Sequence, residues 1–209
     1  MADTTVYAGN VTVAPAGEAK AEVFSALCRL SKWLDDNDLS AYDPFDGLNA
    51  PLARLLTFHN KFLETTLQQG VRRFPLNLRP LLGIHKSQST KGMGFLARAY
   101  IRLHQATGDS GWAQKGRSAL EWLIEHRSRG YSGACWGNHF DYRCRSFYLP
   151  KGVPTVVWTS LIGHAFLDGY YHFKDNDYLE VASSACEHIC RDLEAFQVGG
   201  PCASPMFRG

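Results

Sequence analysis

The side chains best suited to chemistry lie in one stretch of this sequence, residues 131–159. His139, Asp141 and Tyr142 stand within four positions of one another, and all three are residue types that transfer protons. They are therefore the candidate catalytic residues. The alternative is a long structural loop that aromatic packing holds in place, and the composition alone fits both interpretations.

The same stretch also carries the residue types that hold a sugar or an anion. Trp136 and Tyr142 can stack on the apolar face of a sugar ring, and Asn138 can hydrogen-bond its hydroxyl groups. Arg143 and Arg145 can hold a carboxylate or a phosphate in bidentate fashion. Structural hydrogen bonds from these arginines to backbone carbonyls are the competing interpretation.

A second candidate segment lies at residues 42–49, where Asp43 and Asp46 flank a tight turn. Two carboxylates on either side of a sugar can hydrolyse a glycosidic bond, and their separation sets the stereochemical outcome. Asp141 with Asp46 is an alternative pair if the two loops meet. Aspartates in such turns more commonly cap the backbone through their side chains. Both aspartates are retained as candidate binding residues.

Metal and cofactor chemistry is not predicted. Of the six cysteines, Cys186 and Cys190 are four positions apart on an expected helix, but a metal site would need two more ligands. The sequence also lacks a glycine-rich phosphate loop, a nucleophile elbow and a helical His-Glu-x-x-His motif. With no secretory signal near Met1, the cysteines are expected to be reduced thiols of a cytoplasmic protein.

Bulk composition narrows the class of partner. The chain of 209 residues has a formal net charge of +2 and is 45% hydrophobic, as one globular domain would be. This near-neutral balance argues against nucleic acid as a partner. No apolar run approaches the roughly 18 residues that span a bilayer, which argues against a membrane protein. We expect a flexible tail over residues 1–17 and one helical domain over 18–209.

The elements that must position the candidate residues are helices. Apolar residues recur at spacings of three and four, and no segment alternates as a strand would. Gly70 is the expected C-cap of the second helix. The predicted helices span residues 18–36, 51–69, 87–107, 112–127, 155–173 and 178–196.

The last four predicted helices form an internal repeat. Residues 95–122 align without a gap on residues 161–188, a shift of 66, and large side chains meet large ones. The turn residue Asp109 meets Asp175, and Trp112 meets Tyr178. Each unit is a helical hairpin that cannot bury both of its faces alone. The spacing favours an (α/α)-toroid, in which hairpins surround an axis and long loops build a cleft.

Four motifs carry a family resemblance: YDPFDGLN at 42–49, LRPLLGI at 78–84, WGNHFDY at 136–142 and PKGVPTVV at 150–157. Together they resemble a bacterial family of six-hairpin, glycosidase-like proteins found among polysaccharide-biosynthesis genes. Some members carry the label δ-aminolevulinic acid dehydratase. The resemblance covers about residues 20–205 and implies a toroid of roughly twice this length. On that view the chain is truncated at its C-terminus, and either further hairpins or a second copy would cover the last helical face.

The sequence therefore predicts an all-α fold, part of an (α/α)6-type toroid. The resemblance implies a carbohydrate-related protein of polysaccharide metabolism. It would bind a sugar or sugar acid between the 42–49 and 131–154 loops, with acid–base catalysis if it is an enzyme. His139 and Asp141 would carry protons. The rival hypothesis is a non-catalytic helical-repeat scaffold that binds a protein partner, and it predicts an exposed apolar face on the terminal hairpin.

Overall fold

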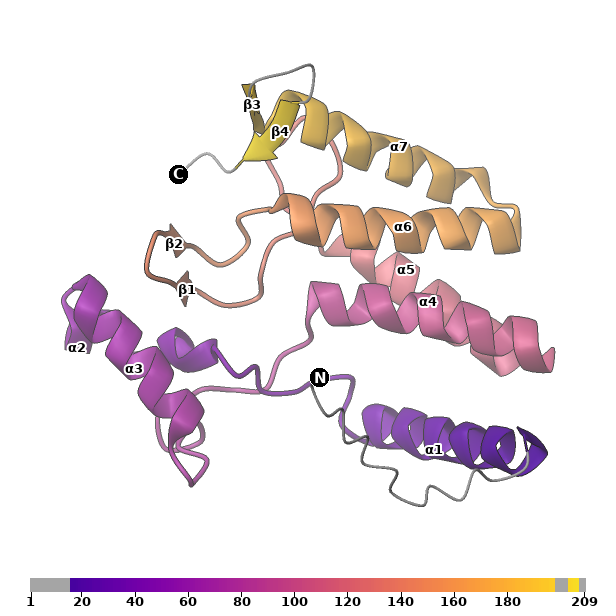
Figure 1. Cartoon of the computed structure of the whole chain (residues 1–209), viewed down its shortest axis with the longest axis horizontal. Coiled ribbons are helices and arrows are strands. Elements are labelled where there is room, and N and C mark those ends of the chain that lie inside the picture. The colour runs from indigo at the N-terminus through magenta and orange to yellow at the C-terminus, as the bar shows by residue number, and fades with distance from the viewer. Residues whose placement is uncertain (1–15, 198–202, 207–209) are drawn as a thin grey trace, which may run out of the picture. The chain divides into compact units, whose positions relative to one another are not determined.

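The computed structural model describes residues 16–197 and 203–206, and it is mostly helical (Figure 1). The chain divides into two units, residues 1–40 and residues 41–209. The predicted tail lies, up to residue 15, outside the described residues. In the part of the chain that is described, no helix is long and apolar enough to cross a membrane.

The first unit contains helix α1, Ala16–Asp36, which confirms the helix predicted over residues 18–36. The helix ends where Asp38 and Leu39 adopt positive φ angles of 51° and 52°. The side-chain amide of Asn37 donates a hydrogen bond to the carbonyl of Trp33 at 2.9 Å, so it satisfies one of the last helical carbonyls.

The second unit begins with three short helical elements: η1 (Asp46–Asn49), α2 (Ala53–Thr57) and α3 (Lys61–Arg73). The single helix predicted over residues 51–69 is wrong, because Phe58 and His59 take positive φ angles and break it. Downstream of the break, the Asn60 side chain accepts hydrogen bonds from two backbone amides and caps α3.

The predicted C-cap at Gly70 is also wrong, because α3 continues through this glycine to Arg73. Phe74 then takes an extended conformation, as the residue before Pro75 must. A small core of Ala50, Ala53, Val71 and Ile84 holds these elements together.

Two helical hairpins follow: α4 (Thr90–Thr107) with α5 (Ser110–Glu125), and α6 (Val156–Phe173) with α7 (Asn176–Arg191). All eight helix ends are offset by 66 residues, which confirms the predicted repeat. The offset holds because equivalent caps set the ends. Thr155 caps α6 as Ser89 caps α4, and Asp175 caps α7 as Asp109 caps α5.

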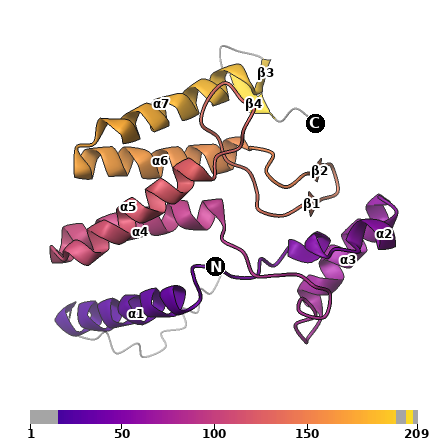
Figure 2. The same cartoon turned by 180° about the vertical axis from the view of Figure 1, so that it is seen from behind.

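The hairpins pack closely, with α6 in contact with both α4 and α7 (Figures 1 and 2). Glycines allow this approach. A Cβ on Gly94 would lie 3.1 Å from the Ile162 side chain, and one on Gly169 would lie 2.7 Å from Leu120. The core between the hairpins consists of fully buried apolar side chains, among them Ala97, Leu120, Leu123, Ile162 and Phe166.

Short strands occupy two places where helix or irregular structure was expected. The predicted helix to residue 196 ends at Arg191, and strand β3 (Glu194–Gln197) pairs antiparallel with β4 (Ala203–Met206). In the long loop between the hairpins, β1 (Tyr142–Arg143) pairs antiparallel with β2 (Tyr148–Leu149). This loop carries most of the candidate residues.

Candidate ligand-binding site

Trp136 anchors the long loop in the core between the hairpins. Its indole Nε1 donates a hydrogen bond to the carbonyl of Leu123 at 2.8 Å, and its ring stacks on Phe166 with centroids 5.6 Å apart. The residue is 0% exposed. A fully buried ring has no free face for a sugar, so Trp136 positions the loop and is not the stacking platform that we predicted.

The segment after Trp136 is held on both sides. Gly137 forms an antiparallel bridge with Pro154, and its carbonyl accepts a hydrogen bond from Thr90 Oγ1 at 2.8 Å. The backbone approach is so close that a Cβ on Gly137 would overlap the Val153 carbonyl. The carbonyl of the next residue, Asn138, accepts from the Gly152 amide at 2.8 Å. We call residues 137–139 the partition, because two cavities meet at Asn138.

The first cavity, of about 470 Å³, is rich in aromatic side chains, and we call it the aromatic cavity. Tyr142 meets Phe45 edge-on at 5.6 Å, and Lys91 Nζ lies 4.6 Å from the centre of the Trp158 ring. The buried Trp158 Nε1 has no hydrogen-bond partner among the described residues. The lining residues are Asp43, Pro44, Phe45, Lys91, Asn138, Phe140, Tyr142, Phe147, Leu149, Thr155, Val157 and Trp158.

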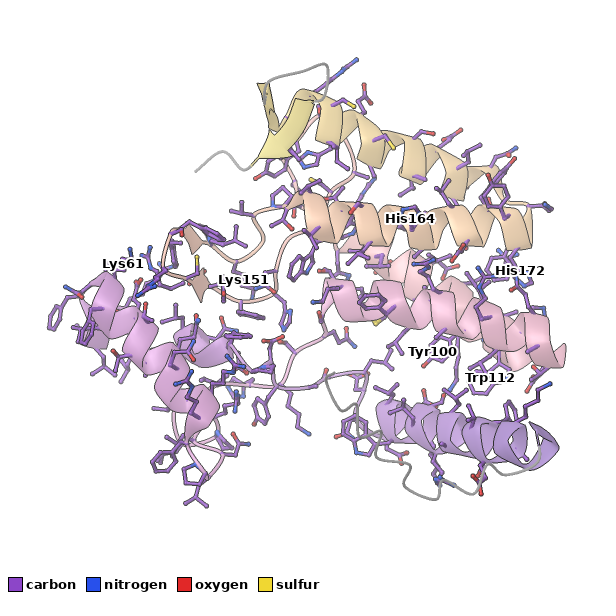
Figure 3. All side chains as sticks on the ribbon, viewed as in Figure 1. Lys61, Tyr100, Trp112, Lys151, His164 and His172 are labelled. Atoms are coloured by element: carbon purple, nitrogen blue, oxygen red, sulfur yellow. The ribbon has the colours of Figure 1, made fainter. Side chains whose placement is uncertain are left out.

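The second cavity, of about 640 Å³, is lined by cations, and we call it the cationic cleft. Arg127, Arg129 and Lys151 line it, and no Asp or Glu is among its lining residues. Lys151 lies on the loop between β2 and α6 (Figure 3). One wall is a stack of Trp122 on His126, with centroids 3.8 Å apart.

The three predicted catalytic residues lie in different places. His139 lines the cationic cleft and Tyr142 lines the aromatic cavity, whereas Asp141 lines neither. Asp141 Oδ1 accepts a hydrogen bond from the Lys151 amide at 2.7 Å, and Oδ2 lies 3.5 Å from Arg54 Nη2. Asp141 is therefore engaged in holding the loop.

His139 is only partly exposed, and its environment favours the neutral ring. Burial lowers the pKa of His139; Asp43 opposes this effect, whereas Lys151 and Lys91 add to it. The buried Nδ1 has no hydrogen-bond partner among the residues that the structure describes. A neutral imidazole at pH 7 can accept or donate a hydrogen bond, so His139 is suited to polar contact with a ligand.

The two predicted anion-binding arginines do not reach either cavity. Arg143 Nε lies 2.6 Å from Glu64 Oε2, and the Arg143 backbone exchanges hydrogen bonds with the Gln68 side chain. Both members of the Arg143–Glu64 pair are largely buried, so this pair joins the loop to α3. Arg145 is exposed to solvent and lines neither cavity.

The two aspartates of the 42–49 turn have different roles. Asp43 lines the aromatic cavity, while its Oδ1 accepts a hydrogen bond from the Phe45 amide at 2.9 Å. Asp46 is buried, and its Oδ1 lies 2.7 Å from Arg79 Nε. Burial raises the pKa of Asp46, and the Arg79 guanidinium opposes that rise. Asp46 thus fixes the turn, and only Asp43 faces the cavity.

Comparison of the chain with protein-family models, with curated proteins and with solved structures found no match. Functional conclusions therefore depend on the geometry of the two cavities.

Sequence reasoning did not identify the arginines of the cationic cleft. Arg127 and Arg129 lie just beyond α5, which ends at Glu125. Their spacing around Ser128, directly before the long loop, was the available signal. Among the described residues, no group of three or more His, Cys, Asp or Glu side chains is placed to hold a metal ion.

Proposed function

We propose that this protein binds a sugar or sugar acid in the aromatic cavity. The observation that carries the proposal is that both predicted loops contribute residues to the wall of this cavity. Asp43 to Phe45 come from the 42–49 turn, and Asn138 to Leu149 come from the long loop. These are the two segments between which we predicted a ligand from the sequence.

The chemistry of the wall supports a carbohydrate. Sugars present apolar C–H faces and polar hydroxyl edges, and the cavity offers aromatic rings together with Asp43, Asn138, Lys91 and Thr155. The unpaired indole N–H of Trp158 is a further donor. A volume of about 470 Å³ falls within the range of roughly 300–1,000 Å³ typical of small-molecule sites.

We propose binding of a sugar and not its hydrolysis by a pair of carboxylates. Asp43 is the single carboxylate among the residues that line the aromatic cavity, whereas glycoside hydrolysis generally needs two. If the aromatic cavity is catalytic, Tyr142, which lines it, is the proton carrier that the geometry favours, because His139 of the partition lines the cationic cleft instead.

We also propose that the two hairpins are part of an (α/α)-toroid in a cytoplasmic protein of polysaccharide metabolism. The repeat with its constant offset of 66 residues supports the toroid. The two hairpins have helices of equal length, so they can stack in the same way around an axis. The resemblance of the four motifs supports the metabolic role.

The test is isothermal titration calorimetry of the full chain with glucose, galactose, glucuronate and galacturonate. We expect at least one to bind, and Tyr142→Ala to weaken it at least about tenfold, or about 1.4 kcal/mol. Tyr171→Ala is the matched control, since Tyr171 is exposed on α6 and lines neither cavity. Failure of all four sugars to bind would contradict the proposal.

A second candidate, a scaffold that binds a protein partner, is favoured by one observation. Large apolar side chains are exposed on α2, on α3 and at the break between them, including Leu55 at 65%, Phe58 at 78% and Phe62 at 75%. The double variant Leu55→Glu/Phe62→Glu, measured by light scattering, tests this candidate. A wild type that self-associates and a variant that is monomeric would support it, and two monomers would count against self-association.

A further inference from the structure

We propose that the cationic cleft is a binding site for a phosphorylated small molecule, separate from the sugar site. The cleft gathers Arg127, Arg129 and Lys151, whose side chains carry three positive charges at neutral pH. A phosphate group carries close to two negative charges at that pH, so the charges are complementary. Arginine forks also match the geometry of phosphate oxygens.

These three cations have no protein counter-ion within the described part of the chain. Their side chains take part in none of the ion pairs there, and no carboxylate lines the cleft. Other arginines of the same molecule are neutralised by carboxylates, for example Arg98 by Asp168 at 2.7 Å and Arg79 by Asp46 at 2.7 Å. A concave surface with three unneutralised cations attracts an anion.

The cations come from two segments that the backbone fixes side by side. Ser128 Oγ donates a hydrogen bond to the carbonyl of Gly152 at 2.6 Å and joins residues 127–129 to residues 151–152. The Ser128 amide donates to the carbonyl of the fully buried Cys135 at 2.9 Å. These hydrogen bonds hold the backbone attachment points of the three cationic side chains together. Less conformational entropy is then lost when a ligand collects them.

The backbone of Lys151, a lining residue of the cleft, is likewise held by a hydrogen bond. The Lys151 backbone amide donates a hydrogen bond to Asp141 Oδ1 at 2.7 Å, so this carboxylate oxygen binds the Lys151 backbone. The second Asp141 oxygen faces Arg54, at 3.5 Å.

Three neighbouring side chains suit a phosphate ester better than a bare ion. The stacked Trp122 and His126 rings form a flat wall of the cleft, against which the organic part of a ligand can lie. His139 belongs to the partition and lines the cationic cleft. Its buried ring nitrogen Nδ1 has no hydrogen-bond partner among the described residues.

The experiment is calorimetric titration of the full chain with inorganic pyrophosphate and with glucose 1-phosphate, at about 50 mM salt so that screening is weak. We expect the double variant Arg127→Ala/Arg129→Ala to weaken both at least about tenfold. The matched control is Arg73→Ala/Arg145→Ala. It removes the same charge from two exposed arginines that line neither cavity, and it should stay within about twofold of wild type.

Equal weakening in both double variants would show an effect of net charge alone and would overturn the proposal, as would no binding of either probe. Titration with glucuronate distinguishes a carboxylate site from a phosphate site. If glucuronate depends on Arg127 and Arg129 as strongly as glucose 1-phosphate does, phosphate is the wrong class.

The sugar proposal and the phosphate proposal fail separately. Loss of pyrophosphate binding in Arg127→Ala/Arg129→Ala while neutral hexoses do not bind at all would keep the phosphate site and remove the sugar site. Hexose binding that depends on Tyr142, with no binding of pyrophosphate or glucose 1-phosphate, would do the opposite.

Discussion

The aromatic cavity and the cationic cleft share one residue, Asn138, and otherwise have opposite chemistry. One is walled by rings and contains a single lysine and a single aspartate. The other contains three cations and no carboxylate. The partition between them is thin, because Gly137 lies against the 152–153 backbone with no room for a side chain. The comparison indicates that the long loop separates an aromatic cavity from a cationic one.

Different contacts hold the two cavities in place, so each can be broken alone. The Arg79–Asp46 pair fixes the turn that supplies Asp43 and Phe45 to the aromatic cavity. The hydrogen bond from Ser128 to Gly152 fixes the cationic cleft. The predictions below use this independence, and they run from the largest expected effect to the smallest.

Gly137→Ala should damage both cavities at once. Its methyl group would overlap the Val153 carbonyl, and neither backbone segment can move without losing the bridge to Pro154. Overpacking of this kind costs about 3 kcal/mol of unfolding free energy, measured by urea denaturation. Gly70→Ala in α3 is the control. A Cβ there meets nothing within 4 Å, so this variant should be as stable as wild type or more so. Equal stability of both variants would contradict the tight partition.

Arg79→Ala should break the aromatic cavity and spare the cationic cleft. It leaves the buried Asp46 carboxylate without its cation, which costs about 3 kcal/mol. We expect hexose binding to be lost and pyrophosphate binding to be kept in calorimetric titrations at a temperature where the variant is folded. The exposed Arg73→Ala should change stability by less than about 0.5 kcal/mol. Loss of both ligands in folded Arg79→Ala would show that the cavities are not independent.

Trp158→Phe should weaken the sugar site while leaving the fold intact. The variant removes a buried N–H that has no partner among the described residues, so unfolding free energy should change by less than about 1 kcal/mol. A ligand that uses this donor loses one hydrogen bond, or about fivefold in affinity. Unchanged hexose affinity would show that the indole N–H does not contact the ligand.

The pH dependence of stability should report on His139. Burial lowers the pKa of His139 in the folded protein below the ordinary 6.5. Between the lowered pKa and 6.5, the unfolded chain therefore binds more protons than the folded one. Stability should therefore be full above about pH 7 and decrease as the pH falls through 6.5 toward the lowered value.

His139→Asn should make that decrease shallower in urea titrations at several pH values. Burial also lowers the pKa of His172, so His172→Asn should flatten the profile as well, but without affecting pyrophosphate binding, because His172 lines neither cavity. A profile of His139→Asn that matches wild type would mean that His139 is not the group that titrates.

The sequence predicted the two hairpins well, because their ends are encoded locally. Asp109 and Asp175 each accept a hydrogen bond from the backbone amide two residues on and so cap the helix that follows. The apolar spacing of three and four holds through every helix of the two hairpins. The break at Phe58 was not predictable in this way. Leu55, Leu56, Phe62 and Leu63 keep a helical spacing across it, and the positive φ angles of Phe58 and His59 have no glycine to signal them.

The sequence placed the two candidate loops together, but it did not predict which contacts their side chains make. Residues of both loops line the aromatic cavity, but Trp136, which we predicted as a stacking platform from its aromatic ring, does not. Its role depends on the carbonyl of Leu123, a contact with no local signature. Arg143 likewise forms an ion pair with Glu64, which lies 79 positions away in the sequence and has no local signature either.

The most direct test of the account is one pair of titrations on three proteins. Wild type, Tyr142→Ala and Arg127→Ala/Arg129→Ala are each titrated with the better-binding neutral sugar, glucose or galactose, and with pyrophosphate. We predict that Tyr142→Ala loses the sugar and keeps pyrophosphate, and that the arginine variant loses pyrophosphate and keeps a neutral sugar. If each variant weakened both ligands to the same extent, the two cavities would not be separate binding sites.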